Sequence, residues 1–201
     1  MNAATYARLC AEAYTVPLDF SAGGISQGII RDTEDGRCIA FQGTQDIAQV
    51  MADIDVGTIY QPIMGDVHRG FLMAAHAVSI RIGVALDDKP AIFTGHSLGG
   101  AIAIVLAALR CLYDHPPAGI ITFGAPRVSI GPAMGALFAK CCVPVVMYRH
   151  AADPVPEVPI NLGPVADWRH PVPLTQLGEP CALPDVADHE IARYVAAVSN
   201  L

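Results

Sequence analysis

The hydrophobic residues of this 201-residue chain follow two different spacings, and the spacing predicts where helices and strands lie. Helical spacing, with apolar residues three or four positions apart, recurs over residues 6–13, 71–86, 98–109, 132–140 and 191–198. Short apolar runs bounded by turn residues predict strands over 25–30, 38–41, 91–94, 120–123 and 143–148, and an edge strand within 168–174. Residues 42–67 show no steady period, and we expect a long, partly helical excursion there.

Strands and helices alternate along the second half of the chain, from residue 91 onward. Such alternation is typical of right-handed crossovers between parallel strands. No repeat, low-complexity tract or linker divides the sequence, and its length suits one core. We therefore predict a single α/β domain over residues 1–201 with a largely parallel sheet.

Residues 95–99 read Gly-His-Ser-Leu-Gly, a G-x-S-x-G sequence between a predicted strand and a predicted helix. In this context the serine of the motif lies on a tight, strained turn, and the glycines let the strand and the helix approach closely. The hydroxyl of Ser97 then projects beside the N-terminus of the helix, where free N–H groups can stabilise developing negative charge. Ser97 is therefore the candidate nucleophile, and His96 is expected to support the turn.

A serine hydroxyl needs a base to accept its proton, and the base needs a group that orients it. Functional groups of open α/β sheets gather at the carboxyl ends of the strands. Asp153 follows the strand predicted over 143–148, and Pro154 disfavours a helical conformation for it. We predict Asp153 as the orienting acid, with an ordinary Asp-Pro turn as the alternative.

Two histidines compete for the role of the base. His189 follows Asp153 in the sequence and begins the last predicted helix, so the chain order nucleophile, acid, histidine favours it. His170 lies in a short segment before Pro171, where a structural role is the usual one for a histidine. We predict His189 as the base.

Two donors are needed to hold the oxyanion of an acyl-transfer intermediate. The backbone N–H of Leu98, the residue after the nucleophile, is one candidate. Thr44 is the other, because it follows an apolar strand end and a glycine that permits close backbone approach. A plain turn is the alternative interpretation of Gly43 and Thr44.

The composition restricts the classes of function. Hydrophobic residues make up 53% of the chain and charged residues 15%, which excludes a disordered protein. The net charge of −7, with lysine only at Lys89 and Lys140, argues against a nucleic-acid partner. The seven histidines show no metal-binding spacing, so neither a metal nor a cofactor is expected.

The six cysteines form no C-x-x-C pair, and we interpret them as mostly buried free thiols, with disulfides as the alternative. The N-terminal residues lack a basic region followed by an apolar run and a cleavage site. The longest uncharged helical stretch, over 98–109, is too short for a membrane span. From these patterns we predict a cytoplasmic location without a transmembrane segment.

Five short motifs occur in an order that is more specific than any one of them. They are Phe-Gln-Gly-Thr at 41–44, Val-His-Arg-Gly-Phe at 67–71, Gly-His-Ser-Leu-Gly-Gly-Ala at 95–101, Thr-Phe-Gly-Ala-Pro-Arg-Val at 122–128 and Asp-Pro-Val-Pro at 153–156. Together they resemble the class 3 (fungal-type) lipase family, and the resemblance runs from about residue 6 to residue 194.

The resemblance implies a three-layer α/β/α fold of the α/β-hydrolase type and the cleavage of carboxylic esters. By position it implies a triad of Ser97, Asp153 and His189, with oxyanion donors at Thr44 and Leu98. Residues 168–170 resemble a structural aromatic-x-His segment of the family, which further favours the histidine at 189 as the base.

Two features set this chain apart from the family it resembles. Members often have arginine where this chain has Gln42. A lid, where members have one, follows the oxyanion residue, and here residues 45–66 occupy that position. A helix over 46–54 would present one apolar face that either packs on the body or forms a mobile lid. We therefore expect simple esterase activity more than interfacial lipase activity.

The expected reaction is the hydrolysis of lipid esters or smaller acyl esters through an acyl-enzyme. Thioesters, amides and acyl transfer are alternatives, because a G-x-S-x-G motif does not settle the leaving group. A catalytically silent protein that binds a lipid or a protein partner is a further alternative. The expected partner is a small ester or lipid, with transient contact to a lipid interface, and the oligomeric state stays open.

Overall fold

The computed structural model describes residues 1–44, 56–86, 91–181 and 183–201. Among these residues the main sheet has seven strands in the order β1-β2-β3-β6-β7-β9-β11. They are β1 (Phe20–Ala22), β2 (Ser26–Thr33), β3 (Gly36–Phe41), β6 (Ala91–His96), β7 (Gly119–Phe123), β9 (Val145–His150) and β11 (Thr175–Leu177). The first three strands pair antiparallel. The pairs from β3 to β11 are parallel, so their carboxyl ends lie together at one end of the sheet.

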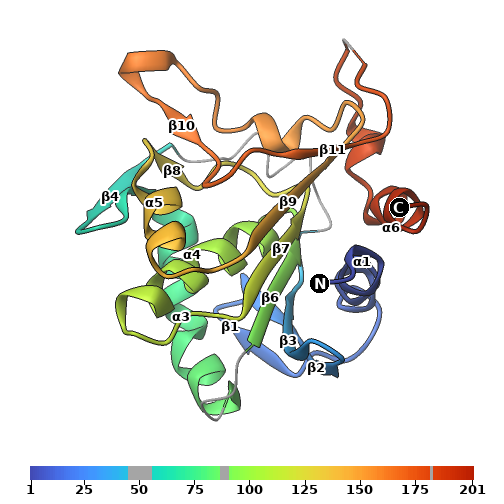
Figure 1. Cartoon of the computed structure of the whole chain (residues 1–201), viewed down its shortest axis with the longest axis horizontal. Helices are drawn as coiled ribbons and strands as arrows, with labels where there is room; N and C mark the ends of the chain where they lie inside the picture. Colours follow the sequence, from blue (N-terminus) through green and yellow to red (C-terminus); the bar gives the residue numbers. More distant parts are fainter. Residues whose placement is uncertain (45–55, 87–90, 182) are drawn as a thin grey trace.

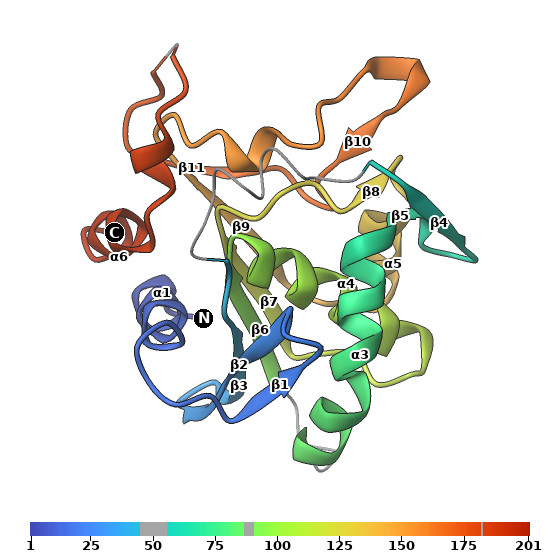
Figure 2. The same cartoon turned by 180° about the vertical axis from the view of Figure 1, so that it is seen from behind.

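Helices cover both faces of this sheet, as Figure 1 and Figure 2 show. One face carries α1 and α6 side by side, with the bounds Ala3–Glu12 and Ile191–Val198. The other face carries α3 (Arg69–Leu86), α4 (Leu98–Leu112) and α5 (Ala133–Lys140). The prediction of an α/β fold with a mostly parallel sheet between helical layers is confirmed.

Alternation along the strands divides the core between the two faces, because successive side chains of a strand point in opposite directions. In β6, Phe93 belongs to the apolar cluster beneath α3 and α4, whereas Ile92 belongs to the cluster beneath α1 and α6. In β7, Ile120 and Ile121 divide in the same way. The central strands are therefore apolar at nearly every position, as expected for parallel strands that are covered on both sides.

Helix α4 follows the serine motif directly and is the most deeply buried helix. All of its residues from Gly99 to Leu109 are buried. A helix that is apolar all round must be covered all round. The sheet covers one side of α4, and α3 and α5 cover others. This burial fixes the N-terminus of α4, and with it the position of Ser97.

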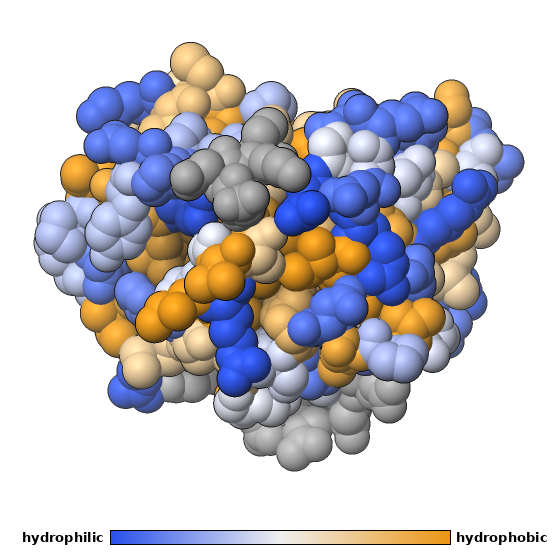
Figure 3. All heavy atoms as spheres, turned by 90° about the horizontal axis from the view of Figure 1, so that it is seen from below, coloured by the Kyte–Doolittle hydropathy of each residue, from blue (hydrophilic) through white to orange (hydrophobic). Residues whose placement is uncertain are grey.

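Helix α3 has the length and composition of a membrane span, with a mean hydropathy of 1.3 over 18 residues. In the structure it packs against α4 and contributes several residues, among them Val78 and Ile82, to the core. Its outer face exposes Met73, Ile80 and Val84. Seen from below, the surface of the molecule shows hydrophobic areas that are broken up by hydrophilic residues (Figure 3).

A second, antiparallel sheet lies beside the main one, in the order β10-β8-β5-β4. Its strands are β4 (Thr58–Gln61), β5 (Gly65–His68), β8 (Ser129–Ile130) and β10 (Trp168–Arg169). The expectation of a partly helical excursion over 42–67 is therefore wrong for the β4–β5 hairpin. Strands this short leave no period in the sequence, and β8 and β10 come from distant parts of the chain. The helix expected over 46–54 lies outside the described residues.

The edge strand expected within 168–174 is also wrong in extent. Only Trp168 and Arg169 are in a strand, and they join the second sheet rather than the main one. Pro171 and Pro173 follow, and proline has no N–H with which to continue a ladder. The edge of the main sheet is instead β11, which pairs with β9.

All six cysteines are free in the structure. Cys10, Cys38 and Cys111 are buried, whereas Cys142 and Cys181 are exposed and Cys141 lies between these classes. The expectation that most of them are buried therefore holds for only half of the set.

Candidate active site

Ser97 occupies a strained turn between β6 and α4. Its backbone has φ 57° and ψ −130°, a left-handed conformation that a serine adopts only where its surroundings impose it. The flanking glycines impose it by close contact. A Cβ at Gly95 would lie 2.4 Å from the carbonyl carbon of Gly99, and a Cβ at Gly99 would lie 2.3 Å from the Phe41 oxygen. The motif therefore forms the tight strand-to-helix elbow that its sequence predicts.

Asp153 lies just beyond β9 and is fully buried. Its Oδ1 accepts the backbone N–H of Val155 at 2.8 Å, and its Oδ2 accepts the Nδ1–H of His189 at 2.8 Å. The hydroxyl of Tyr194, in α6, donates to the same Oδ2. Each of these contacts uses the carboxylate as an acceptor, which suits an ionised aspartate.

Two arginines hold the loop that carries Asp153. Arg149 Nε donates to the backbone oxygen of Asp153 at 3.1 Å. Arg149 and Arg127 both form ion pairs with Glu157, the last residue of the 3₁₀ helix η1 (Val155–Glu157). The loop after β9 is therefore fixed from outside by charge pairs and from inside by the carboxylate itself.

His189 ends the 3₁₀ helix η3 (Val186–His189) and is also fully buried. Its neighbour Asp188 anchors the segment, because Asp188 accepts the backbone N–H of Ala152 and a side-chain N–H of Arg193, both at 3.0 Å. Since Nδ1 of His189 faces a carboxylate, that nitrogen carries the proton and Nε2 is left as an acceptor.

The turn after β7 fits closely beneath this pair. Gly124 has φ +61°, and a Cβ there would lie 2.8 Å from Asp153 Oδ2 and 2.9 Å from His189 Nδ1. Only a glycine combines this backbone conformation with this proximity. Strands β6, β7 and β9 thus contribute Ser97, Gly124 and Asp153 at the same end of the sheet.

The buried polar atoms without a hydrogen-bond partner among the described residues include two that belong to this site, Ser97 Oγ and His189 Nε2. One is a hydroxyl and the other is an imidazole acceptor, which are the two groups that a serine–histidine pair requires. Catalytic hydrogen bonds in unliganded sites often form only when substrate binds.

A polar groove of about 390 Å³ adjoins the elbow. Its lining carries no charged side chain and consists of Gly24, Ile25, Gln27, Gln42, Gly43, Thr44 and Leu98. Both predicted oxyanion donors, Thr44 and Leu98, therefore face the same groove. Gly43 packs so tightly beside them that a Cβ on it would lie 3.0 Å from Ser97 Cβ.

His170 is part of a different contact. Its Nε2 donates to the carbonyl oxygen of Pro156 at 2.8 Å, and burial lowers its pKa to about 4. It is a neutral histidine that supports the loop after Asp153. The structure thus brings His189, and not His170, against the carboxylate.

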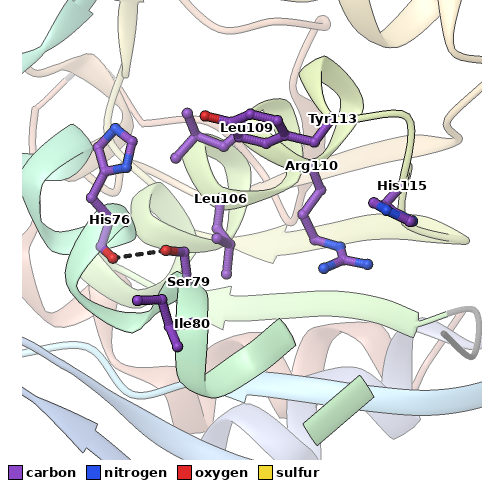
Figure 4. A pocket seen from close by; sticks show the side chains of 8 residues that line it. All are labelled: His76, Ser79, Ile80, Leu106, Leu109, Arg110, Tyr113 and His115. Atoms are coloured by element: carbon purple, nitrogen blue, oxygen red, sulfur yellow. Dashed lines mark hydrogen bonds between the residues drawn. The ribbon is translucent and has the colours of Figure 1, made fainter. Parts of the chain in front are cut away.

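Another groove, of about 360 Å³, lies between α3 and α4 (Figure 4). Figure 4 shows His76, Ser79 and Ile80 of α3 facing Leu106 and Leu109 of α4 across it. It contains none of the predicted site residues. Within the described part of the chain, no group of three or more His, Cys, Asp or Glu side chains is arranged to hold a metal ion.

The sequence matches a family model described as lipase (class 3) over residues 38–162. The chain belongs to the class 3 lipase family. One relative, the secreted mono- and diacylglycerol lipase 1 of Fusarium solani, is 38% identical over 105 residues, which cover 46% of this chain and 29% of that protein. A lipase of Rhizopus niveus is 33% identical over 136 residues, covering 60% and 34%. The chain thus spans about a third of the length of the curated relatives it matches.

Solved lipases share the fold of this class 3 lipase domain. The triacylglyceride lipase of Rhizomucor miehei superposes with a TM-score of 0.75 at 20% identity, covering 93% of this chain and 91% of that one. A lipase from Rhizopus microsporus var. chinensis gives a TM-score of 0.74 at 21% identity, covering 94% and 83%. The fold is therefore that of the α/β-hydrolase lipases.

The predicted cytoplasmic location is wrong for this member of the family. It depended on the absence of a leader pattern at the first residues, and the matched relatives include a protein whose name describes it as secreted. The pattern at the start of the given sequence does not decide the location.

Three residues of the site lie outside the region that defines the lipase family here. They are His189, Tyr194 and Tyr14, whose hydroxyl lies 2.8 Å from Nδ1 of His96, because the match covers only residues 38–162. Chain order in the sequence predicts His189, but no pattern in the sequence predicts a role for either tyrosine. Helical spacing treats a buried tyrosine as an apolar residue, so nothing in the pattern indicated that the Tyr194 hydroxyl contacts Asp153.

Proposed function

We propose that this class 3 lipase hydrolyses carboxylic esters of lipids or smaller acyl esters through an acyl-enzyme. Ser97 is the nucleophile, His189 the general base, Asp153 the orienting acid, and the N–H groups of Thr44 and Leu98 the oxyanion donors. The observation that carries the proposal is the buried His189–Asp153 hydrogen bond of 2.8 Å at the end of the sheet where Ser97 lies in its strained elbow.

In the first half of the reaction, Ser97 Oγ attacks the ester carbonyl carbon while His189 Nε2 takes the hydroxyl proton. The carbonyl oxygen becomes an oxyanion and is held by the two backbone N–H groups. Asp153 stabilises the imidazolium that forms. The carbon–oxygen bond to the alcohol then breaks, and His189 returns the proton to the departing alkoxide.

In the second half, water attacks the acyl-enzyme and His189 takes one of its protons. The bond to Ser97 breaks, the proton passes to Ser97 Oγ, and the carboxylic acid leaves. The Asp153 contact keeps the ring proton on Nδ1, so Nε2 of the neutral ring is the acceptor that this step needs at its start.

The names of the relatives support an ester of a lipid as the substrate, since they include a mono- and diacylglycerol lipase and a lipase. A solved neighbour with a TM-score of 0.69 bears the description that a serine protease triad forms the catalytic centre of a triacylglycerol lipase. The secreted Fusarium relative also supports an extracellular location.

The test is a series of p-nitrophenyl esters, from acetate to palmitate, with the wild type, Ser97→Ala and the control Ser21→Ala. Ser21 is an exposed residue of β1 and does not line the groove beside the elbow. We expect Ser97→Ala to fold normally and to lose at least ~10³-fold in kcat, as triad deletions do, and Ser21→Ala to match the wild type. Near-wild-type turnover in Ser97→Ala would refute the assignment. A parallel panel of thioesters and amides tells hydrolysis of oxygen esters from the related reactions.

A further inference from the structure

The imidazole of His96, the residue before the nucleophile, lies between three parts of the site. Its Nδ1 is 2.8 Å from the hydroxyl of Tyr14, which follows α1. Its Nε2 is 2.7 Å from the backbone carbonyl oxygen of His189. A carbonyl oxygen only accepts, so Nε2 of His96 carries the proton and Nδ1 is an acceptor. The Tyr14 hydroxyl must therefore donate to Nδ1.

Burial keeps this arrangement in one protonation state. It lowers the pKa of His96 well below its usual value, and the neighbouring His189 lowers it further. Burial also raises the pKa of the Tyr14 phenol above its usual value, so the phenol keeps the proton that it donates. Neither group changes charge in the range where His189 must act as a base.

Tyr14 extends the contact to the loop that carries the predicted oxyanion donor. Gly43 lies against the Tyr14 oxygen, and its backbone N–H acts on the phenol in the direction of a lower pKa, opposite to burial. Gly43 has no room for a side chain, since a Cβ would lie 2.4 Å from that oxygen and 2.5 Å from the His96 carbonyl oxygen. The next residue is Thr44. Hydrogen bonds thus connect Tyr14, His96 and His189, and close packing joins Gly43 to Tyr14.

The rings of His96 and His189 are also in contact, with centroids 4.5 Å apart and an angle of 35° between their planes. During acylation the ring of His189 becomes positively charged. A neutral His96 beside it avoids the repulsion that a second imidazolium would cause.

We infer that Tyr14 and His96 are positioning residues of this site. Together they hold the loop at Gly43 and Thr44, and the base His189, in place beside Ser97. The inference rests on the proposed function. Neither residue touches the reacting atoms, and each acts through a neighbour. The N-terminal segment that carries Tyr14, which lies outside the family match, is on this account part of the active site.

Two substitutions of His96 separate its hydrogen bond to Tyr14 from its hydrogen bond to His189. In His96→Gln, the side-chain amide nitrogen can still donate to the His189 carbonyl, but Tyr14 loses its acceptor. In His96→Asn, the amide oxygen can still accept from Tyr14, but His189 loses its donor. Tyr14→Phe removes only the hydroxyl that contacts His96 and Gly43, and it leaves the hydrogen bond between His96 and His189 in place. The matched control is Tyr113→Phe, because Tyr113 is an exposed tyrosine just after α4.

The measurements are kcat and KM for one p-nitrophenyl ester, with Tm for every variant, at a temperature well below each Tm. We expect kcat to fall about 5- to 10-fold in Tyr14→Phe and in each His96 variant, as the loss of one hydrogen bond predicts. KM should change less than about twofold, and Tyr113→Phe should match the wild type. A purely structural role would lower Tm and leave kcat of the folded enzyme unchanged, and that result would overturn the inference.

A second measurement needs no variant. Nitrogen-15 NMR of the wild type reports the tautomer of each histidine ring, and His96 should be neutral with the proton on Nε2 at pH 6.5, where an ordinary histidine is half protonated. A proton on Nδ1, or a charged ring at that pH, contradicts the inference.

The kinetic results tell a failure of this inference from a failure of the proposed function. If the wild type is active and depends on Ser97 while the variants keep full kcat, only this inference fails. If Ser97→Ala keeps full activity, the proposed function itself fails.

Discussion

The two faces of the central sheet differ in what they supply. The face under α3, α4 and α5 holds the larger apolar cluster of the core. The face under α1 and α6 is smaller, and the hydroxyl and imidazole groups of the site lie on this side: Tyr14 follows α1, His189 precedes α6, and Tyr194 is part of α6. The comparison teaches that one face mainly stabilises the fold while the other mainly orients the chemistry.

The largest expected effect is on the orienting face. Asp153→Asn keeps the shape of the side chain but removes the charge that fixes the tautomer of His189, so kcat should fall about 10³- to 10⁴-fold. The fold should survive, because an amide oxygen in the place of Oδ1 can still accept the backbone N–H of Val155. Steady-state kinetics with circular dichroism checks both statements. The control is Asp114→Asn in the exposed turn after α4, which should be fully active. If Asp153→Asn loses less than about tenfold in kcat, Asp153 is not the orienting acid.

The opposite pattern is expected on the apolar face. Ile82 of α3 is fully buried, so Ile82→Ala should lower the free energy of unfolding by about 3 kcal/mol through lost burial and the cavity it leaves. The kcat of the folded enzyme should not change. Urea denaturation and kinetics measure the two effects. Ile80→Ala, on the exposed side of the same helix, should alter stability by less than about 0.5 kcal/mol. A large loss of kcat in Ile82→Ala would show that the two faces are not separate in this way.

A smaller effect concerns pH and the loop after Asp153. The folded pKa of His170 is about 4, below its ordinary value of 6.5, because the buried ring stays neutral. The unfolded chain therefore binds a proton that the folded chain does not, and stability falls as pH drops from 6.5 toward 4. In His170→Gln the amide can still donate to Pro156 but cannot be protonated. This variant should lose less Tm than the wild type between about pH 7 and about pH 5. An equal loss in both proteins would rule out His170 as a source of the pH dependence.

The sequence alone predicted most of the main sheet, and the reason is physical. Parallel strands that are buried on both faces must be apolar at nearly every position, and the helices between them must have one or more apolar faces. The runs ending near Thr94, Phe123 and Tyr148 show this pattern clearly. The G-x-S-x-G motif adds a geometric requirement, since only glycine fits at positions 95 and 99, two residues before and after Ser97.

Other features leave too weak a pattern in the sequence. The two-residue strands β8 and β10 exist only because distant segments meet, so no local period predicts them. Tyr14 and Tyr194 act through single hydroxyl atoms, which a classification into apolar and polar residues does not register. Asp153 and His189 were identified from chain order and position relative to the strands, and the structure places them in contact.

The central claim, that Ser97 is an activated nucleophile, is tested most directly by covalent labelling. The wild-type protein is treated with a fluorophosphonate, and the adduct is mapped by mass spectrometry of its peptides. The account predicts one adduct, on Ser97, formed much more slowly in Asp153→Asn and absent in Ser97→Ala. Hydrolysis of esters without any adduct on Ser97, or an adduct on a different serine that abolishes activity, would contradict it.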